Sequence, residues 1–150
     1  MRVVIQRVSE ASVSINGNIK SKINRGLLIL LGIEEADTKE DIGWLCGKLC
    51  RLRIFDDENK VMNLSITDIK GEILVISQFT LHASTKKGNR PSYIKAARPE
   101  MAIPLYENFV EELRKLFEGP VFTGEFGAMM DVSLVNNGPV TIVIDSKTRE

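Results

Sequence analysis

The N-terminal part of the chain shows the alternating apolar and polar pattern of β-strands. Residues 2–8 are rich in β-branched side chains, and residues 12–15 and 19–23 alternate with period two on either side of Asn16-Gly17. Both central positions of a type I′ turn have positive φ, so an Asn-Gly pair between alternating segments predicts a β-hairpin. The almost wholly apolar residues 27–33 predict a strand covered on both faces.

Two later segments carry apolar residues at helical spacing. The first runs from about residue 39 to 51 after Thr38, which forms a capping-box pattern with Asp41. The second starts at Pro99 and ends at Gly119-Pro120. Their apolar stripes are Ile42, Leu45, Leu49 and Leu52 in the first, and Leu105, Phe109, Leu113 and Leu116 in the second. These stripes predict two amphipathic helices, each packing one face against a core.

Three further strands are expected in the second half of the chain. Residues 72–79 are typical of a central strand, and residues 129–135 and 140–144 are typical of two apolar strands. The last two are separated by Asn136-Asn137-Gly138-Pro139. A two-residue hairpin there is one option, although the proline would stand awkwardly at its end.

Length and element order indicate one domain over residues 1–150. A chain of this size buries a sizeable core without metals or disulfides. The elements predict an α+β fold with a mixed or antiparallel sheet and two main helices, and the polar residues 146–150 are expected to fray. Cys46 and Cys50, four apart, match no metal or redox motif and are expected to be buried thiols.

Charge and hydropathy narrow the classes of function. Lys plus Arg and Asp plus Glu are both 20, so any surface that attracts nucleic acid must be local. The N-terminal apolar run is too short for a signal peptide and no segment reaches membrane-spanning length, so we expect a cytoplasmic protein without membrane contact. One histidine cannot build a metal cluster, and phosphate-loop and dinucleotide fingerprints are absent from the sequence.

Candidate chemistry begins at the end of the apolar strand, in Ser77-Gln78-Phe79-Thr80-Leu81-His82. Backbone N–H groups that leave a sheet here can face a ligand, and Ser77, Gln78 and Thr80 add polar side chains. Thr80 and His82 would share a face of an extended backbone, which leaves a Thr nucleophile with a His base conceivable. An ordinary junction between strand and loop has the same composition.

Residues 73–99 hold five basic side chains and no acid: Lys86, Lys87, Arg90, Lys95 and Arg98. Such a local concentration in a neutral protein is typical of a surface that binds a phosphate backbone. Acids elsewhere in the fold could equally neutralise it. Lys86, Lys87 and Arg90 are favoured as contacts because Gly88 and Pro91 indicate a loop.

The Gly138-Pro139 pair is the last candidate. X-Pro bonds are cis in only about 5–6% of cases, so the dipeptide alone argues against a cis bond. Two strands meeting at this pair would nevertheless hold it rigidly. Outward-pointing carbonyls in such a turn would bind an ammonium group and leave no room for a substituent on one side.

Five motifs in order resemble the D-aminoacyl-tRNA deacylase family, formerly called D-tyrosyl-tRNA deacylase. They are Val-Ile-Gln-Arg-Val at 4–8, Ser-Gln-Phe-Thr at 77–80, Lys-Gly-Asn-Arg-Pro-Ser at 87–92, Gly-Glu-Phe-Gly-Ala-Met-Met at 124–130 and Asn-Asn-Gly-Pro-Val-Thr at 136–141. The resemblance extends from Met1 to about Val143, and several motifs in register are far more specific than any one of them.

The resemblance implies a cytoplasmic homodimer with a barrel-like sheet and two composite sites at the subunit interface. Ser77, Gln78, Phe79 and Thr80 would line the pocket for the 3′-terminal aminoacyl-adenosine of an aminoacyl-tRNA. Phe126 and Met130 match positions around that adenosine. A cis Gly138-Pro139 bond, steadied by Arg7, would enter the partner's pocket.

The implied reaction is hydrolysis of the aminoacyl ester to free D-amino acid and tRNA, with no metal or organic cofactor expected. An L side chain would collide with the Gly138-Pro139 backbone, whereas glycine would escape, so glycyl-tRNA(Ala) is an expected second substrate. Either Thr80 is the nucleophile, or backbone N–H groups near Phe79 and Thr80 form an oxyanion hole while the tRNA 2′-hydroxyl assists. A threonine without a base is a weak nucleophile, which favours the second option.

Two other interpretations stay open from the residues alone. The chain could be a non-catalytic module that binds tRNA or a nucleotide through residues 86–98. It could also be a Thr80/His82 hydrolase of small esters.

Overall fold

The predicted N-terminal hairpin is confirmed. In the computed structural model, which describes residues 1–149, β1 (Arg2–Ile15) pairs antiparallel with β2 (Asn18–Ile23). Asn16 and Gly17 between them have φ values of 50° and 79°. These are the positive values that a type I′ turn demands, so the Asn-Gly signal marks the turn correctly.

The apolar run after the hairpin forms the centre of the sheet. β3 (Gly26–Gly32) pairs antiparallel with β1 and parallel with β6 (Glu72–Ser77). Leu27 belongs to the core cluster beneath the helices, whereas Leu28 belongs to a second cluster on the other side of the strand. Burial on both faces explains why β3 lacks the alternation of a half-exposed strand.

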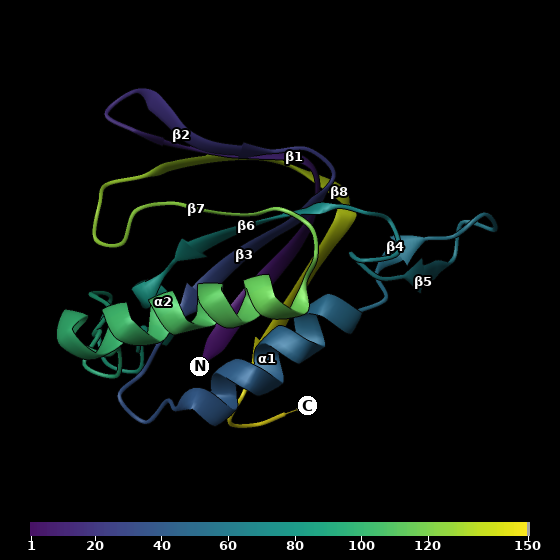
Figure 1. Cartoon of the computed structure of the whole chain (residues 1–150). Coiled ribbons are helices and arrows are strands. Elements are labelled where there is room, and N and C mark those ends of the chain that lie inside the picture. Colours follow the sequence, from purple (N-terminus) through teal and green to yellow (C-terminus); the bar gives the residue numbers. More distant parts are fainter. Residues whose placement is uncertain (150) are drawn as a thin grey trace.

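The sheet is mixed and curls into a nearly closed barrel (Figure 1). β7 (Val121–Thr123) pairs parallel with β6, and β8 (Asp131–Asp145) pairs antiparallel with β1. The Ser21 hydroxyl on β2 donates a hydrogen bond of 2.6 Å to the Thr123 carbonyl on β7. This bond joins the two sides of the curled sheet, so the expected α+β, barrel-like architecture is confirmed.

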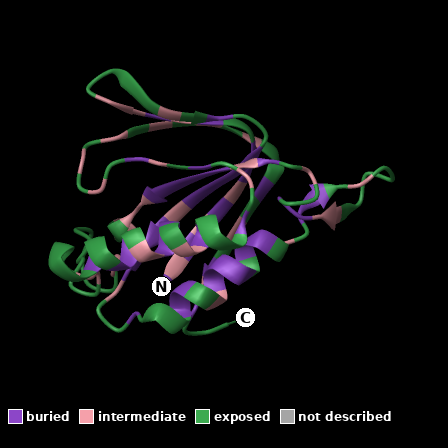
Figure 2. Ribbon diagram, viewed as in Figure 1, coloured by how far each residue is buried: buried purple, intermediate pink, exposed green. Residues whose placement is uncertain are grey.

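Two helices pack on one face of the sheet (Figure 1). α1 (Lys39–Arg51) begins with the predicted capping box, in which Thr38 and Asp41 each bond the other's backbone N–H, and α2 (Pro99–Leu116) has its proline in the first turn. Figure 2 shows burial on the sheet and on the inward sides of both helices, with the outer sides exposed. Both predicted helices are thus confirmed.

A short ribbon stands apart from the main sheet. It consists of β4 (Phe55–Asp56) and β5 (Met62–Leu64), which pair only with each other and project from one end of the molecule (Figure 1). The 3₁₀ helix η1 (Phe79–His82) lies at the other end, after β6. The two ends of the sheet therefore carry different structures.

The central strand ends earlier than its composition predicts. β6 ends at Ser77 instead of Phe79, and the next residues turn into η1. Its partner β3 ends at Gly32. Beyond Ser77 the Gln78 N–H still donates a hydrogen bond of 2.7 Å to the Leu31 carbonyl of β3. Without a neighbouring strand to bond, the extended backbone has no partner and the chain turns.

The two C-terminal strands expected on either side of Asn136-Asn137-Gly138-Pro139 are one element. Both halves of β8 run antiparallel to β1, so a hairpin between them is wrong. Thr141 and Asn136, five positions apart, stand against Gln6 and Val8, which are two positions apart. The excess residues form a bulge that pushes the Gly138-Pro139 turn outward while the strand continues.

The C-terminal residues do not fray, contrary to expectation, as far as Arg149. Ser146 is 2% exposed, and its hydroxyl donates to Asp41 and accepts a bond from the Met1 ammonium group. Lys147 pairs with Asp41 at 2.8 Å. Buried polar partners hold this segment where hydrophobicity alone would not, and Glu150 lies outside the described residues.

The two cysteines are buried thiols, as expected. Cys46 is 0% exposed and Cys50 is 8% exposed, and burial raises the pKa of both above the ordinary value. A thiol held in its neutral form is a weak nucleophile, so these residues serve packing. Within residues 1–149, no helix is long and apolar enough to cross a membrane.

Candidate functional site

The Ser77–Thr80 segment lies at the end of β6, where the sheet stops. Ser77 is level with Leu31 on β3, and the chain then turns so that the Phe79 side chain is 56% exposed. Ser77, Gln78 and Thr80 are partly buried. The sequence correctly identified this strand end as a place where polar groups leave the sheet.

Two backbone donors in this segment have no protein acceptor. Among residues 1–149, no hydrogen bond is present from the N–H groups of Phe79 and Thr80, which open η1. The Gln78 N–H, by contrast, bonds the Leu31 carbonyl. Adjacent free N–H groups at the first turn of a helix point toward whatever lies in front of it.

The Thr80 hydroxyl oxygen accepts a hydrogen bond of 2.6 Å from the Gln78 side-chain amide. Within residues 1–149 no base is hydrogen-bonded to it, because η1 replaces the expected extended backbone that would place Thr80 beside His82. His82 is instead 3% exposed, with Nδ1 4.0 Å from a Glu34 carboxylate oxygen. The pairing of Thr80 with His82 that the spacing suggested is therefore not supported.

A shallow hollow of about 270 Å³ opens beside this segment. Ser77, Gln78 and Phe79 form one wall, and residues 127–130 form another. Met130 thus lines the same hollow as Ser77, Gln78 and Phe79. The floor is apolar, with Ile76 and Val132 among the lining residues.

Phe126 is placed less directly. Its ring packs edge to face on Tyr106 of α2 at 5.7 Å between centroids, and it contacts the core beneath the helices. It does not line the hollow that Met130 and Phe79 share. In one chain, Phe126 therefore packs on the core beside α2, directly before residues 127–130 in the sequence.

The basic residues lie on an exposed loop next to the hollow. Ser84 and Ser92 bond each other's backbone in both directions, at 2.8 and 2.9 Å, and close the base of the loop. All five cations of this segment are exposed, and within residues 1–149 none forms an ion pair: Lys86, Lys87, Arg90, Lys95 and Arg98. Neutralisation by acids of this chain is thereby disfavoured.

The Gly138-Pro139 turn projects from β8 at a different place. Its peptide bond is cis, and both residues are exposed. Gly138 has φ of 129°, and a Cβ added there would lie 2.8 Å from Val140 Cγ2 and 2.9 Å from an Arg7 nitrogen. Only glycine fits this backbone without strain.

The Arg7 side chain fixes the base of this turn through hydrogen bonds. Its side chain is almost fully buried, and Nε donates to the Asn137 carbonyl at 3.0 Å. Nη1 donates to the Ile54 carbonyl at 2.7 Å and to Asp56 at 3.2 Å. The short ribbon therefore helps to fix the turn, which sequence reasoning missed because nothing marks Ile54 or Asp56 as partners of a residue some fifty positions earlier.

The turn and the hollow lie at opposite ends of the sheet. Ser77 is level with Val3 through β3, whereas the turn is level with Arg7, about 13 Å further along β1 at the usual rise per residue. Three strand spacings also separate β8 from β6. One chain does not bring its Gly138-Pro139 turn to its own Ser77–Thr80 segment.

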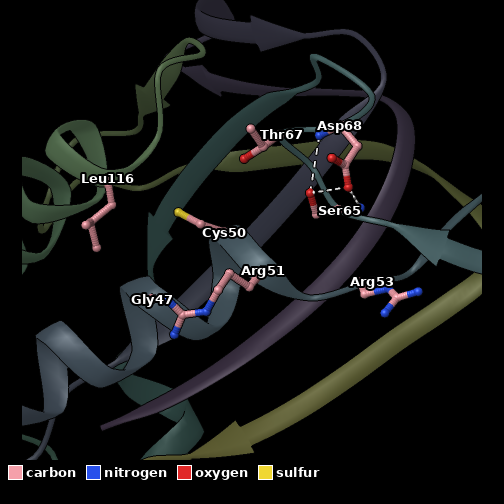
Figure 3. Close-up of a pocket in the computed structure, with 8 residues that line it drawn as sticks. All are labelled: Gly47, Cys50, Arg51, Arg53, Ser65, Thr67, Asp68 and Leu116. Carbon is pink, nitrogen blue, oxygen red and sulfur yellow. Dashed lines mark hydrogen bonds between the residues drawn. The ribbon is translucent and has the colours of Figure 1, made fainter.

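A larger hollow of about 470 Å³ lies between the end of α1 and residues 65–68 (Figure 3). It holds none of the predicted site residues. Figure 3 shows Arg51 and Arg53 on different sides of it, so they do not converge on one anion. The Ser65 N–H and hydroxyl bond Asp68 and lower the pKa of that carboxyl. The Asp68 carboxylate in this hollow is therefore already hydrogen-bonded.

Residues 1–149 contain no group of three or more His, Cys, Asp or Glu side chains placed to hold a metal ion. The groups available to a ligand at the strand end are instead N–H donors, hydroxyls, an amide and nearby cations.

The chain is similar to known proteins over nearly its whole length. Residues 4–145 match the protein-family model described as D-Tyr-tRNA(Tyr) deacylase. Two proteins named D-aminoacyl-tRNA deacylase, from Flavobacterium johnsoniae and Bacteroides fragilis, are 65% and 67% identical to this chain, and each match covers all of both chains. A solved structure titled c-Myc DNA Unwinding Element Binding Protein is 41% identical with a TM-score of 0.92, over 97% of this chain and 98% of its own.

Proposed function

The chain belongs to the D-Tyr-tRNA(Tyr) deacylase family, and we propose that it hydrolyses the ester bond of D-aminoacyl-tRNA, releasing a D-amino acid and reusable tRNA. The observation that carries this proposal is the end of β6, where the N–H groups of Phe79 and Thr80 have no protein acceptor among residues 1–149 and Phe79 lines a hollow near a cationic loop. These groups suit an ester carbonyl next to a phosphate backbone.

The reaction needs stabilisation of negative charge on the ester carbonyl oxygen. Water adds to the carbonyl carbon, the bond from that carbon to the 3′ oxygen breaks, and the 3′ oxygen leaves with a proton. The N–H groups of Phe79 and Thr80 would donate to the oxyanion of the intermediate. In this assignment the terminal adenosine occupies the hollow beside Met130.

Thr80 is assigned a supporting role. Its oxygen already accepts the Gln78 amide proton, and no base contacts it within residues 1–149. A hydroxyl without a base attacks slowly at neutral pH. The neighbouring 2′-hydroxyl of the terminal ribose is the better placed proton shuttle, so we assign water activation to the substrate.

Selection against L-amino acids is assigned to Gly138 and Pro139. The turn is exposed, has no side chain at Gly138 and is fixed through Arg7. Its carbonyls would hold the α-ammonium group, and an L side chain would then meet backbone. Glycine has no side chain to reject, so glycyl-tRNA(Ala) is proposed as a second substrate.

The separation of the turn from the hollow favours a composite site in a homodimer. The turn of one copy would enter the hollow of the other. The outer face of β8 exposes Val135 and Val143 at 49% and 63%, which gives a second copy apolar surface to cover. The proposed enzyme is therefore a cytoplasmic dimer in which each chain gives both the hollow and the turn.

The experiment is a turnover assay with D-Tyr-tRNA and L-Tyr-tRNA at enzyme concentrations far below substrate. Many turnovers on the D form and hardly any on the L form would support the proposal. Equal rates on both forms would overturn chiral selection.

A nucleic-acid-binding module without catalysis is the second candidate, favoured by the unpaired cations of residues 86–98. One solved relative is named as a DNA-element-binding protein. The same assay separates the two functions: a module binds tRNA stoichiometrically and leaves the ester intact.

A further inference from the structure

An aromatic pair stands between the hollow and the basic loop. The rings of Phe79 and Tyr93 meet edge to face, with centroids 5.0 Å apart and an interplanar angle of 74°. Both rings are solvent-accessible, at 56% and 40% exposure. Phe79 also lines the hollow, so Tyr93 is the next ring encountered on leaving it toward the loop.

This surface is apolar and open. Ile94, directly after Tyr93, is 86% exposed. Large apolar side chains in contact with one another are ordinarily buried, and such a group left exposed beside a candidate site indicates a binding surface. Aromatic rings offer flat faces that suit other flat groups.

The backbone around Tyr93 is held in place. Ser92 is fixed by the two bonds to Ser84, and the Tyr93 carbonyl accepts the Ala96 N–H at 3.0 Å. The Ala97 N–H donates to the carbonyl of Ile33, the residue directly after β3, at 2.9 Å. The ring is therefore presented by a preformed loop, which reduces the ordering needed for binding.

The charge beside the rings identifies the class of ligand. Lys86, Lys87 and Arg90 lie on the loop tip without ion-pair partners within residues 1–149. The Arg98 backbone N–H donates a hydrogen bond to a Glu35 carboxylate oxygen, at the end of the segment far from the loop tip. Aromatic faces interleaved with cations are the pattern of surfaces that bind single-stranded nucleic acid.

We propose that Tyr93, braced by Phe79, stacks an unpaired base of the tRNA acceptor strand immediately before the terminal adenosine. Lys86, Lys87 and Arg90 contact the phosphates of that strand. This inference rests on the proposed function, because the hollow must hold the terminal adenosine for the preceding nucleotide to reach Tyr93. The ligand class is single-stranded RNA, which this surface recognises through base stacking and phosphate charge.

Kinetics on two substrates test the role of Tyr93. Tyr93→Leu should lower kcat/KM for D-Tyr-tRNA about tenfold, the loss of one base stack. It should leave hydrolysis of 3′-O-D-tyrosyl-adenosine unchanged, because that substrate has no preceding base. Tyr93→Phe keeps the ring and should retain the tRNA rate, and Ile19→Ala, at an exposed apolar residue on the hairpin, serves as a matched control.

A binding measurement keeps the inference separate from catalysis. Fluorescence anisotropy gives the affinity for single-stranded RNA that ends in CCA and carries no amino acid. The Kd of this RNA should be about tenfold higher for Tyr93→Leu than for the wild type, whereas the Kd of a duplex with the same number of phosphates should be unchanged. Lys86→Gln with Lys87→Gln should instead reduce the salt dependence of binding to both RNAs. If the wild-type protein binds the single strand through Tyr93 but hydrolyses neither ester, the proposed function is refuted and the RNA-binding role of Tyr93 is not.

Three results would overturn the inference. One is an equal loss on both ester substrates, which would place Tyr93 in the hollow itself. Another is unchanged RNA affinity in Tyr93→Leu. The third is dissociation of the oligomer by this substitution in size-exclusion chromatography, which would make the surface a contact between protein copies.

Discussion

The Ser77–Thr80 segment and the Gly138-Pro139 turn differ in how the fold holds them. The first leaves backbone donors free at a strand end, beside a shallow hollow. The second is a bulge fixed by the buried Arg7 side chain, which donates to Asn137 in the turn and to Ile54 and Asp56 beside it. Open donors suit chemistry on a ligand, whereas a rigid projection that presents backbone at Gly138 suits steric rejection. We infer that reaction and selection are divided between them.

The largest effect is expected from a substitution in the Gly138-Pro139 turn. Gly138→Ala forces a side chain onto a backbone with φ of 129° and toward Val140 and Arg7, so the turn must shift. A displacement of about 1 Å costs roughly a hundredfold in rate, which we expect in kcat/KM for D-Tyr-tRNA. Gly17→Ala is the matched control, because Gly17 also has positive φ but no atom within 4 Å of the added Cβ. Similar losses in both variants would show that backbone strain alone is responsible.

The next largest effect is expected from removing the Arg7 side chain, which fixes this turn. Arg7→Ala leaves the Ile54 carbonyl without its donor in a buried place and removes a partly buried bond to the Asn137 carbonyl, so the free energy of unfolding in urea should fall by about 2–4 kcal/mol. Arg53→Ala removes an exposed bond to Asn63 and should cost about 0.5 kcal/mol or less. Equal stabilities of the two variants would contradict the role given to Arg7.

The opposite end of the sheet has its own buried polar cluster, and acid should weaken it. Burial opposes ionisation of Asp41, but hydrogen bonds from Lys147 and Ser146 hold the pKa of its carboxyl below the ordinary value. A lowered folded-state pKa stabilises the protein above the unfolded value of about 3.9 and loses that contribution as pH falls through the folded value. Asp41→Asn should therefore cost about 2 kcal/mol at pH 7 and progressively less below pH 4, measured by urea unfolding. A cost independent of pH would contradict this.

The smallest effect is expected within the open region. Thr80→Ala should keep kcat within about threefold, because its hydroxyl is assigned no bond-making step. A tRNA ending in 2′-deoxyadenosine should by contrast be hydrolysed very slowly by the wild-type enzyme. A folded Thr80→Ala protein that binds tRNA normally but is inactive would make Thr80 the nucleophile.

Local patterns predicted most of the secondary structure. The Asn16-Gly17 turn, the Thr38 capping box and the proline start of the second helix each depend on a few neighbouring residues, and all are present. Elements governed by distant partners were mispredicted. β6 ends where its neighbour ends, and β8 stays one strand because β1 pairs with both halves.

The candidate site shows the same division. Ser77, Gln78 and Phe79 line one hollow with Met130, and the Phe79 ring contacts Tyr93 of the basic segment. The sequence did not reveal that Ile54 and Asp56 hold Arg7, or that Tyr93 packs on Phe79. Those contacts depend on loop paths that no local pattern encodes.

Complementation between two inactive variants tests the central claim, that the hollow of one chain works with the turn of another. Gly138→Ala damages the turn, and Ala128→Trp fills the hollow that Ala128 lines. Co-refolded in equal amounts, the two should recover about a quarter of the wild-type rate on D-Tyr-tRNA, because half of randomly paired dimers are mixed and each has one intact site. No activity above that of the separate variants, in mixed dimers isolated by two tags, would contradict the account.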